Sequence, residues 1–183
     1  MNQHDMTRNM VLAALFAALT AIGAFLQIPT GTVPITLQFL FTALAGLLLG
    51  WKWGAISQLL YVGIGLLGLP VFTQGGGIGY VLQPSFGFLL GLIPAAAVIG
   101  ALTARRTGYL TVLAAVLVGD LILYAVGVPY MYLILHVYMQ SAKTFPALLA
   151  AMLVYVPGDT LKIVVVTALA PVLRRTLAKA VPN

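Results

Sequence analysis

The sequence has 183 residues, of which 62% are hydrophobic and 7% are charged, and its mean hydropathy is +1.09. A soluble domain carries roughly 25% charged residues, so this composition excludes a soluble protein and predicts an all-α integral membrane protein. The absence of cysteine excludes disulfides and thiolate metal sites, and the basic residues behind the net charge of +6 are too dispersed to predict a nucleic-acid partner.

Six apolar segments, separated by Pro, Gly and charged residues, are predicted to be transmembrane helices. They cover residues of about 8–27, 34–50, 54–69, 81–103, 109–138 and 147–174. The longest of them exceed the length that a helix needs to cross a hydrocarbon core of about 30 Å. Because no soluble domain or low-complexity tract interrupts them, we expect one membrane domain over residues 1–183.

The basic residues predict the orientation of these spans. With a cytoplasmic N-terminus, seven of them lie inside and Lys143 alone lies outside. The seven are Arg8, Lys52, Arg105, Arg106, Arg174, Arg175 and Lys179. We therefore expect both termini in the cytoplasm, and the nearly uncharged loops 28–34, 70–83 and 139–146 on the outer side.

The first span carries a stripe of alanines, namely Ala13, Ala14, Ala17, Ala18 and Ala21. Small side chains let helices approach closely in a bilayer, either within one protein or between two membrane proteins. Both readings stay open for this stripe. After the first outer loop, Gln38 begins the second span, where its amide either closes over a ligand or satisfies an interfacial hydrogen bond.

The glycine-rich stretch GGGIGYVLQP, residues 75–84, does not predict a nucleotide site, because no strand and no Gly-Lys-Ser/Thr step accompany it. Its glycines allow a tight loop whose backbone can approach a ligand closely. Tyr80 and Gln83 at its end offer an aromatic ring and an amide. A plain connection between spans is the alternative.

Asp159 and Lys162 lie within the apolar last span, in the stretch YVPGDTLK. Charged groups at that depth are expensive and usually belong to a functional site. Residues three apart share a helix face, and we expect the Pro157-Gly158 step to open the helix just before them. Asp120 reaches a similar depth and is either a second acceptor around Lys162 or a carboxyl that burial keeps neutral. An ion pair that only fixes helix register is the alternative for the pair.

Three segments together resemble the BioY family, the biotin-specific S components of energy-coupling factor (ECF) transporters. They read IPTGTVPITLQ, LGLPVFTQGGGIGYVLQPSFGFLLG and VPGDTLK. The resemblance implies a six-helix protein of a prokaryotic cell membrane that binds biotin near its outer side, needs no cofactor and performs no chemistry. It also implies a transmembrane coupling subunit and two cytoplasmic ATPases as partners.

The resemblance further implies roles for individual residues. Asp159 and Lys162 correspond to the family's substrate-contacting pair, Tyr80 and Gln83 to its outer-loop contacts, and Ala14-xxx-Ala18 to its docking surface for the coupling subunit. Asp120 and Gln38 complete the set of candidate ligand contacts.

Other functions predict other behaviour. A solitary secondary transporter would move biotin without partners, and a retinal pigment would form a Schiff base on Lys162. An intramembrane enzyme would need a general acid and base, for which three acidic residues and two isolated histidines leave few candidates, and those histidines predict no metal site.

Overall fold

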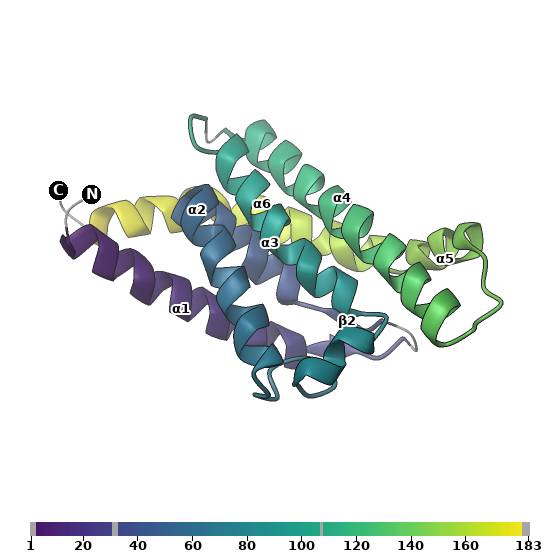
Figure 1. The fold of residues 1–183 in the computed structure, drawn as a ribbon. Coiled ribbons are helices and arrows are strands. Elements are labelled where there is room, and N and C mark those ends of the chain that lie inside the picture. The colour runs from purple at the N-terminus through teal and green to yellow at the C-terminus, as the bar shows by residue number, and fades with distance from the viewer. Residues whose placement is uncertain (1–2, 31–32, 107, 181–183) are drawn as a thin grey trace.

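The computed structural model describes residues 3–30, 33–106 and 108–180, and the side chains of residues 177–180, including Lys179, lie outside this description. Helices dominate the described chain, so the predicted all-α membrane fold is confirmed (Figure 1). The elements are α1 (Gln3–Phe25), β1 (Gln27–Ile28), β2 (Ile35–Thr36), α2 (Gln38–Leu66), the 3₁₀ helix η1 (Ile78–Leu82), α3 (Phe86–Leu102), α4 (Tyr109–Leu133), the π helix η2 (Ile134–Tyr138), α5 (Phe145–Ala151), the 3₁₀ helix η3 (Met152–Val154) and α6 (Val156–Ala180).

Helix α2 reverses direction at Gly50, whose φ of 79° and ψ of 179° are not helical. Only glycine adopts such a positive φ readily. Its arms, residues 38–49 and 51–66, lie side by side, because a Cβ at Gly54 would stand 2.7 Å from the Cα of Gly46. The arms correspond to the second and third predicted spans. The prediction placed a longer connection between them, whereas the second arm begins directly at Trp51.

Among the residues that the structure describes, four helical stretches are long and apolar enough to cross a membrane: α1, α2, Tyr109–Tyr138 and Val156–Thr176. Helix α3 supplies a further apolar segment of 17 residues. With the two arms of α2 counted separately, these are the six predicted segments. The last predicted span, residues 147–174, is divided in the structure. Helix α5 ends at Ala151, the short 3₁₀ helix η3 follows, and α6 begins at Val156.

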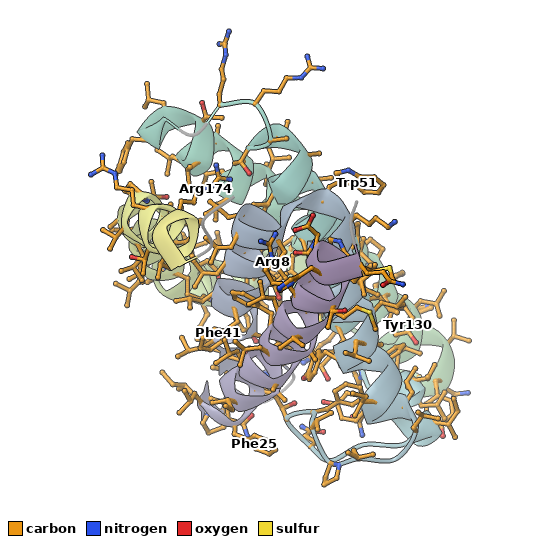
Figure 2. The ribbon with its side chains drawn as sticks, turned by 90° about the vertical axis from the view of Figure 1, so that its left-hand side faces the viewer. Arg8, Phe25, Phe41, Trp51, Tyr130 and Arg174 are labelled. Atoms are coloured by element: carbon orange, nitrogen blue, oxygen red, sulfur yellow. The ribbon has the colours of Figure 1, made fainter. Side chains whose placement is uncertain are left out.

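The connections alternate between two ends of the bundle. Arg174 Nη2 donates a 2.7 Å hydrogen bond to the carbonyl of Leu47, and its guanidinium lies 3.4 Å from the carbonyl of Thr103. These contacts bring the Gly50 turn, the end of α3 and the last turns of α6 together, at the end that also carries the termini (Figures 1 and 2). The β1–β2 hairpin and the connection after α2 lie at the opposite end.

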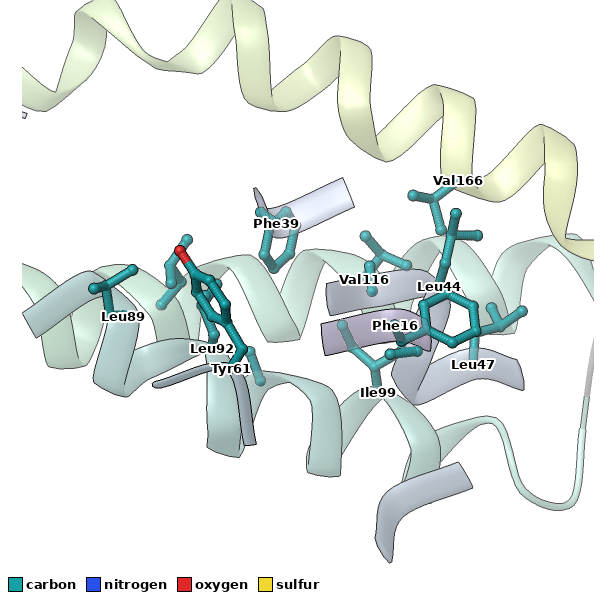
Figure 3. Packing of buried hydrophobic residues seen from close by; sticks show 14 of the residues in the cluster. Phe16, Phe39, Leu44, Leu47, Tyr61, Leu89, Leu92, Ile99, Val116 and Val166 are labelled. Atoms are coloured by element: carbon teal, nitrogen blue, oxygen red, sulfur yellow. The ribbon is translucent and has the colours of Figure 1, made fainter. Parts of the chain in front are cut away.

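This arrangement gathers the basic residues as the sequence predicts. Arg8, Lys52, Arg105, Arg106, Arg174 and Arg175 are at the end with the termini, which we call the basic end, and Lys143 is at the other. A hydrophobic core joins the helices between the two ends (Figure 3). It includes Phe16 of α1, Leu44 of α2, Ile99 of α3, Val116 of α4 and Val166 of α6.

Candidate functional site

Asp159 and Lys162 form a buried ion pair on one face of α6. Lys162 Nζ lies 2.5 Å from Asp159 Oδ1, and the two residues are 7% and 6% exposed. The spacing of three residues stacks the side chains on adjacent turns. Asp159 also lies in the first turn of α6, where the helix dipole favours a negative charge. The pairing predicted from the sequence is confirmed.

The Pro157-Gly158 step does not break a helix in the way that the sequence predicted. Both residues belong to the first turn of α6, and the irregular backbone is η3 and Tyr155 before them. Proline fits the first turn of a helix, because the amide that it lacks would have no partner there. The step therefore starts α6 just ahead of the ion pair instead of opening it.

Tyr124 and Thr36 complete the surroundings of the pair. The hydroxyl of Tyr124, from α4, donates to Asp159 Oδ2. Lys162 Nζ donates to the carbonyl of Thr36 in β2 at 3.2 Å. An ammonium has three donors and a carboxylate accepts about four hydrogen bonds, so each ion retains free capacity. Both ions therefore have partners within the protein and keep unused hydrogen-bonding capacity.

A cavity opens beside this pair, with about 620 Å³ of empty space including its open mouth. Its walls come from the β1–β2 region, α2, the connection before α3, α3, α4, η3 with Tyr155, and α6. The lining residues are Val33, Pro34, Ile35, Thr36, Gln38, Phe39, Thr73, Tyr80, Ser85, Phe88, Leu89, Leu92, Leu123, Tyr124, Met152, Tyr155, Asp159 and Lys162. Small-molecule sites commonly combine such apolar walls with a few polar groups, and we call this cavity the main cavity.

Two of the predicted ligand contacts, Gln38 and Tyr80, line the main cavity. Gln38 Nε2 donates to the Tyr61 hydroxyl at 2.7 Å, and its Oε1 accepts from Thr36 Oγ1 at 2.9 Å. The Tyr80 hydroxyl is 2.8 Å from Thr73 Oγ1. These hydrogen bonds fix both side chains at the cavity wall. The start of α2, the glycine-rich connection and α6 all contribute residues to this one cavity.

The apolar part of the wall is rich in aromatic rings. Phe88 of α3 and Tyr124 of α4 are packed edge to face with their centroids 5.9 Å apart. Phe39 of α2 and Leu92 of α3 are buried beside them, at 2% exposure each. A ligand with one polar end and an apolar body would find both surfaces within the same cavity.

The remaining two predicted ligand contacts lie outside the lining. Asp120 on α4 is close enough to Asp159 and Lys162 to interact with their charges. Its Oδ1 is buried and has no hydrogen-bond partner within the part of the chain that the structure describes. Gln83 follows η1 as an exposed residue and does not line the main cavity.

The alanine stripe of α1 divides between two faces. Ala13 and Ala17 are buried in the bundle, whereas Ala14 and Ala18 are exposed. One stripe was predicted, but the helix turns its members to different sides. The pair Ala14-xxx-Ala18 therefore stays available for contact with another protein.

Several lining residues were missed at the sequence level. Tyr124 lies four residues after Asp120 and so shares its helix face, which was a usable signal. Thr36 contributes a backbone carbonyl, and Tyr155 donates to the backbone carbonyl of Val33. Contacts through backbone carbonyls cannot be predicted from residue types, because every residue carries a carbonyl.

The arrangement offers a set of polar groups that can hold a small ligand. The side chains at the cavity end offer an ammonium, a carboxylate and hydroxyls in one cluster, which complements a ligand that carries N–H donors next to a carbonyl. Among the described residues, no group of three or more His, Cys, Asp or Glu side chains could hold a metal ion.

Comparisons with known proteins agree on one family. Residues 1–179 match the sequence model of the BioY family. The chain is 52% identical to the "Probable biotin transporter BioY" of Lysinibacillus sphaericus over 147 residues, which cover 79% of this chain and 75% of that protein. It is 35% identical to the "Biotin transporter BioY" of Thermotoga maritima over 164 residues, which cover 89% and 94%.

The fold also matches a solved structure, a 2.1 Å crystal structure of the S-component for biotin from an ECF-type ABC transporter. The TM-score is 0.84 and the sequences are 29% identical. The match covers 96% of this chain and 95% of the other. The similarity thus extends over nearly the whole bundle that carries the main cavity.

Proposed function

The chain belongs to the BioY family, and from that premise we propose that it captures biotin as the S component of an ECF-type transporter. The observation that carries this proposal is the Asp159–Lys162 pair, which stands beside an apolar and aromatic cavity and keeps free hydrogen-bonding capacity. The relatives are named as transporters, in keeping with a binding subunit that is not an enzyme.

Biotin complements this site chemically. Its ureido ring presents N–H groups and a carbonyl, which pair with the Asp159 carboxylate and the Lys162 ammonium. Its fused thiophane ring fits against Phe39, Phe88 and Leu92. Tyr80 and Gln38 hold further hydrogen-bonding groups at the wall. Asp120, which does not line the cavity, contributes in this proposal through its interaction with the Asp159–Lys162 pair.

Gln83 has weaker support as a ligand contact. It is exposed and lies outside the lining of the main cavity, so its predicted contact with biotin stays a prediction from the sequence.

The energy for uptake comes, in this proposal, from a coupling subunit and two cytoplasmic ATPases. The basic end of the bundle faces the cytoplasm of a prokaryotic cell, since basic residues are enriched on that side of membrane proteins. The main cavity then opens toward the outside, as its lining by the β1–β2 region and by the connection after α2 supports.

A titration tests the function directly. The purified protein should bind biotin saturably and should not bind lipoate, which has a similar acid chain but a ring without N–H or carbonyl groups. Asp159→Asn should weaken biotin binding by about a hundredfold, because it removes the charged acceptor and leaves Lys162 without its counter-ion. Equal affinity for lipoate and biotin, or unchanged affinity for biotin in Asp159→Asn, would contradict the assignment.

The docking face can be tested separately. Ala14→Leu places a bulky side chain on the exposed face of α1, so it should prevent co-purification with the coupling subunit while biotin binding stays unchanged. Leu15→Ala, on an exposed neighbouring position, is the matched control and should co-purify normally. Normal assembly in Ala14→Leu would remove Ala14-xxx-Ala18 from the proposed interface.

A further inference from the structure

A separate cavity lies at the basic end of the bundle, and we call it the basic-end cavity. It holds about 810 Å³ of empty space including its open side. It lies where the Gly50 turn of α2, the end of α3 and the last turns of α6 meet, and it shares no lining residue with the main cavity. Its lining residues are Leu47, Leu48, Leu49, Gly50, Trp51, Gly100, Thr103, Ala104 and Arg174.

Arg174 places a guanidinium in the wall of this cavity. Its Nη2 donates to the carbonyl of Leu47 at 2.7 Å, and both Nη1 and Nη2 lie 3.4 Å from the carbonyl of Thr103. The two carbonyls belong to the ends of helical stretches, where backbone acceptors lack helical partners and a cation is favourable. A guanidinium has five N–H donors, so at least two remain for a further acceptor.

The chain itself offers almost no anion to the basic end. Its three acidic residues are Asp5, Asp120 and Asp159. Asp5 forms a salt bridge with Arg8, and the other two interact with each other and with the lysine of α6. Within the described chain, Arg174 has no salt bridge. Further positive charge at this end comes from the exposed residues Lys52, Arg105, Arg106 and Arg175.

The rest of the cavity wall is mainly apolar. Leu48 and Leu49 are half-buried, and Trp51 is 60% exposed. Tryptophan favours the boundary between hydrocarbon and headgroups, so Trp51 places the cavity at that depth of the bilayer. Figure 2 shows Arg174 and Trp51 toward the same end of the molecule. A soluble anion would use only the guanidinium, whereas a lipid would also cover the leucines and the indole.

We propose that the basic-end cavity binds an anionic phospholipid, with Arg174 donating to the phosphate and with Leu48, Leu49 and Trp51 against the acyl chains. Basic pockets between transmembrane helices bind lipid headgroups in this way. The site is independent of the main cavity and of its ligand. Because Arg174 joins α2, α3 and α6, a bound lipid would hold the ends of these helices together.

Native mass spectrometry of the full chain in neutral detergent tests the site with two lipids. Phosphatidylglycerol carries a net negative charge, and phosphatidylcholine with the same acyl chains carries none. One phosphatidylglycerol molecule should stay bound to each protein, with a preference of about five- to tenfold over phosphatidylcholine. Inorganic phosphate at millimolar concentration should not displace it, because it lacks acyl chains.

Variants at Ala104 test the place of binding. Arg174 is left unchanged, since its loss would leave two helix-end carbonyls without a donor. Ala104→Glu puts a carboxylate into the lining and should abolish retention of phosphatidylglycerol, whereas Ala104→Lys should strengthen it. A folding defect would not give opposite effects of opposite charges. Ala101→Glu, at an exposed position outside the lining, is the matched control and should retain the lipid.

Four results would overturn the proposal. Equal retention in Ala104→Glu and Ala104→Lys would remove the cavity from lipid binding, and equal loss in Ala101→Glu would indicate only a general surface charge. Displacement of the lipid by inorganic phosphate would indicate a site for a free anion. Loss of the coupling subunit from Ala104→Glu, with phosphatidylglycerol still retained, would make the cavity a protein contact.

Discussion

The polar cluster on α6 and a second polar cluster between α1 and α2 are both buried, and they differ in how fully their hydrogen bonds are made. The second cluster consists of Thr20, Thr42, Ser57 and Gln58, all 0% exposed. Gln58 Nε2 donates to Thr20 Oγ1 at 3.3 Å and to Ser57 Oγ at 3.0 Å, and Gln58 Oε1 accepts from Thr42 Oγ1 at 2.9 Å. None of the four lines the main cavity.

The α6 cluster shows the contrary arrangement. Asp159 and Lys162 are nearly as buried, but each keeps hydrogen-bonding capacity, and empty space lies beside them. The difference teaches that buried polarity alone does not identify a site in this bundle. A complete network joins helices, whereas an incomplete one next to a cavity can receive a ligand.

The largest effect is expected from Lys162→Met. The change removes a donor from the ligand and leaves the buried Asp159 carboxylate without its counter-ion. Saturable biotin binding should fall by more than about a hundredfold, and the free energy of unfolding should fall by about 3–5 kcal/mol. Equilibrium binding and denaturant unfolding in detergent measure the two effects.

A double variant separates binding from folding. Asp159→Asn combined with Lys162→Met removes both charges, so much of the lost stability should return while biotin affinity stays reduced by more than about a hundredfold. Restored binding in the double variant would show that the pair only fixes helix register and does not contact the ligand.

A smaller effect is expected from Tyr124→Phe. The ring and its packing on Phe88 remain, but the hydrogen bond from the hydroxyl to Asp159 Oδ2 is lost. The carboxylate is then less firmly oriented, and biotin affinity should drop by about tenfold, since a hydrogen bond to a charged group contributes about 1.5 kcal/mol or more. Tyr132→Phe, which alters another half-buried tyrosine of α4, should bind biotin normally.

The sequence identified the charged cluster because ionisable residues are rare in apolar spans. Asp159 and Lys162 could be paired from their spacing alone, and the six segments could be read from hydropathy and basic loops. The reversal within α2 was placed correctly to within a few residues, since Gly50 and the following Trp-Lys-Trp run mark an interface.

Other features depend on tertiary packing and leave no local pattern. The Tyr124 hydroxyl donates a hydrogen bond to Asp159, which is 35 residues away in the sequence. Lys162 donates one to the Thr36 carbonyl, which is 126 residues away. The split of the alanine stripe into exposed Ala14 and buried Ala17 depends on which face α2 covers. The separation of α5 from α6 also left no local signal, and the sequence predicted one continuous span there.

Gln58→Leu is the test of the complete network, and its expected effect on binding is the smallest. The leucine is close in size to glutamine, and the three hydroxyls keep their bonds to the carbonyls of Phe16, Gln38 and Gly54. No buried donor is stranded, so the free energy of unfolding should fall by only about 0.5–2 kcal/mol. Biotin affinity should stay within about twofold of the unchanged protein.

Gln38 connects the α1–α2 cluster with the main cavity, so the Gln58→Leu test shows whether the two are coupled. Its backbone carbonyl accepts from Thr42 Oγ1 at 2.9 Å, and its side chain lines the main cavity. If Gln58→Leu lowered biotin affinity by tenfold or more, the two clusters would act as one unit through Gln38. Unchanged affinity together with reduced stability would establish that the α1–α2 cluster holds helices together and that ligand recognition belongs to the cluster on α6.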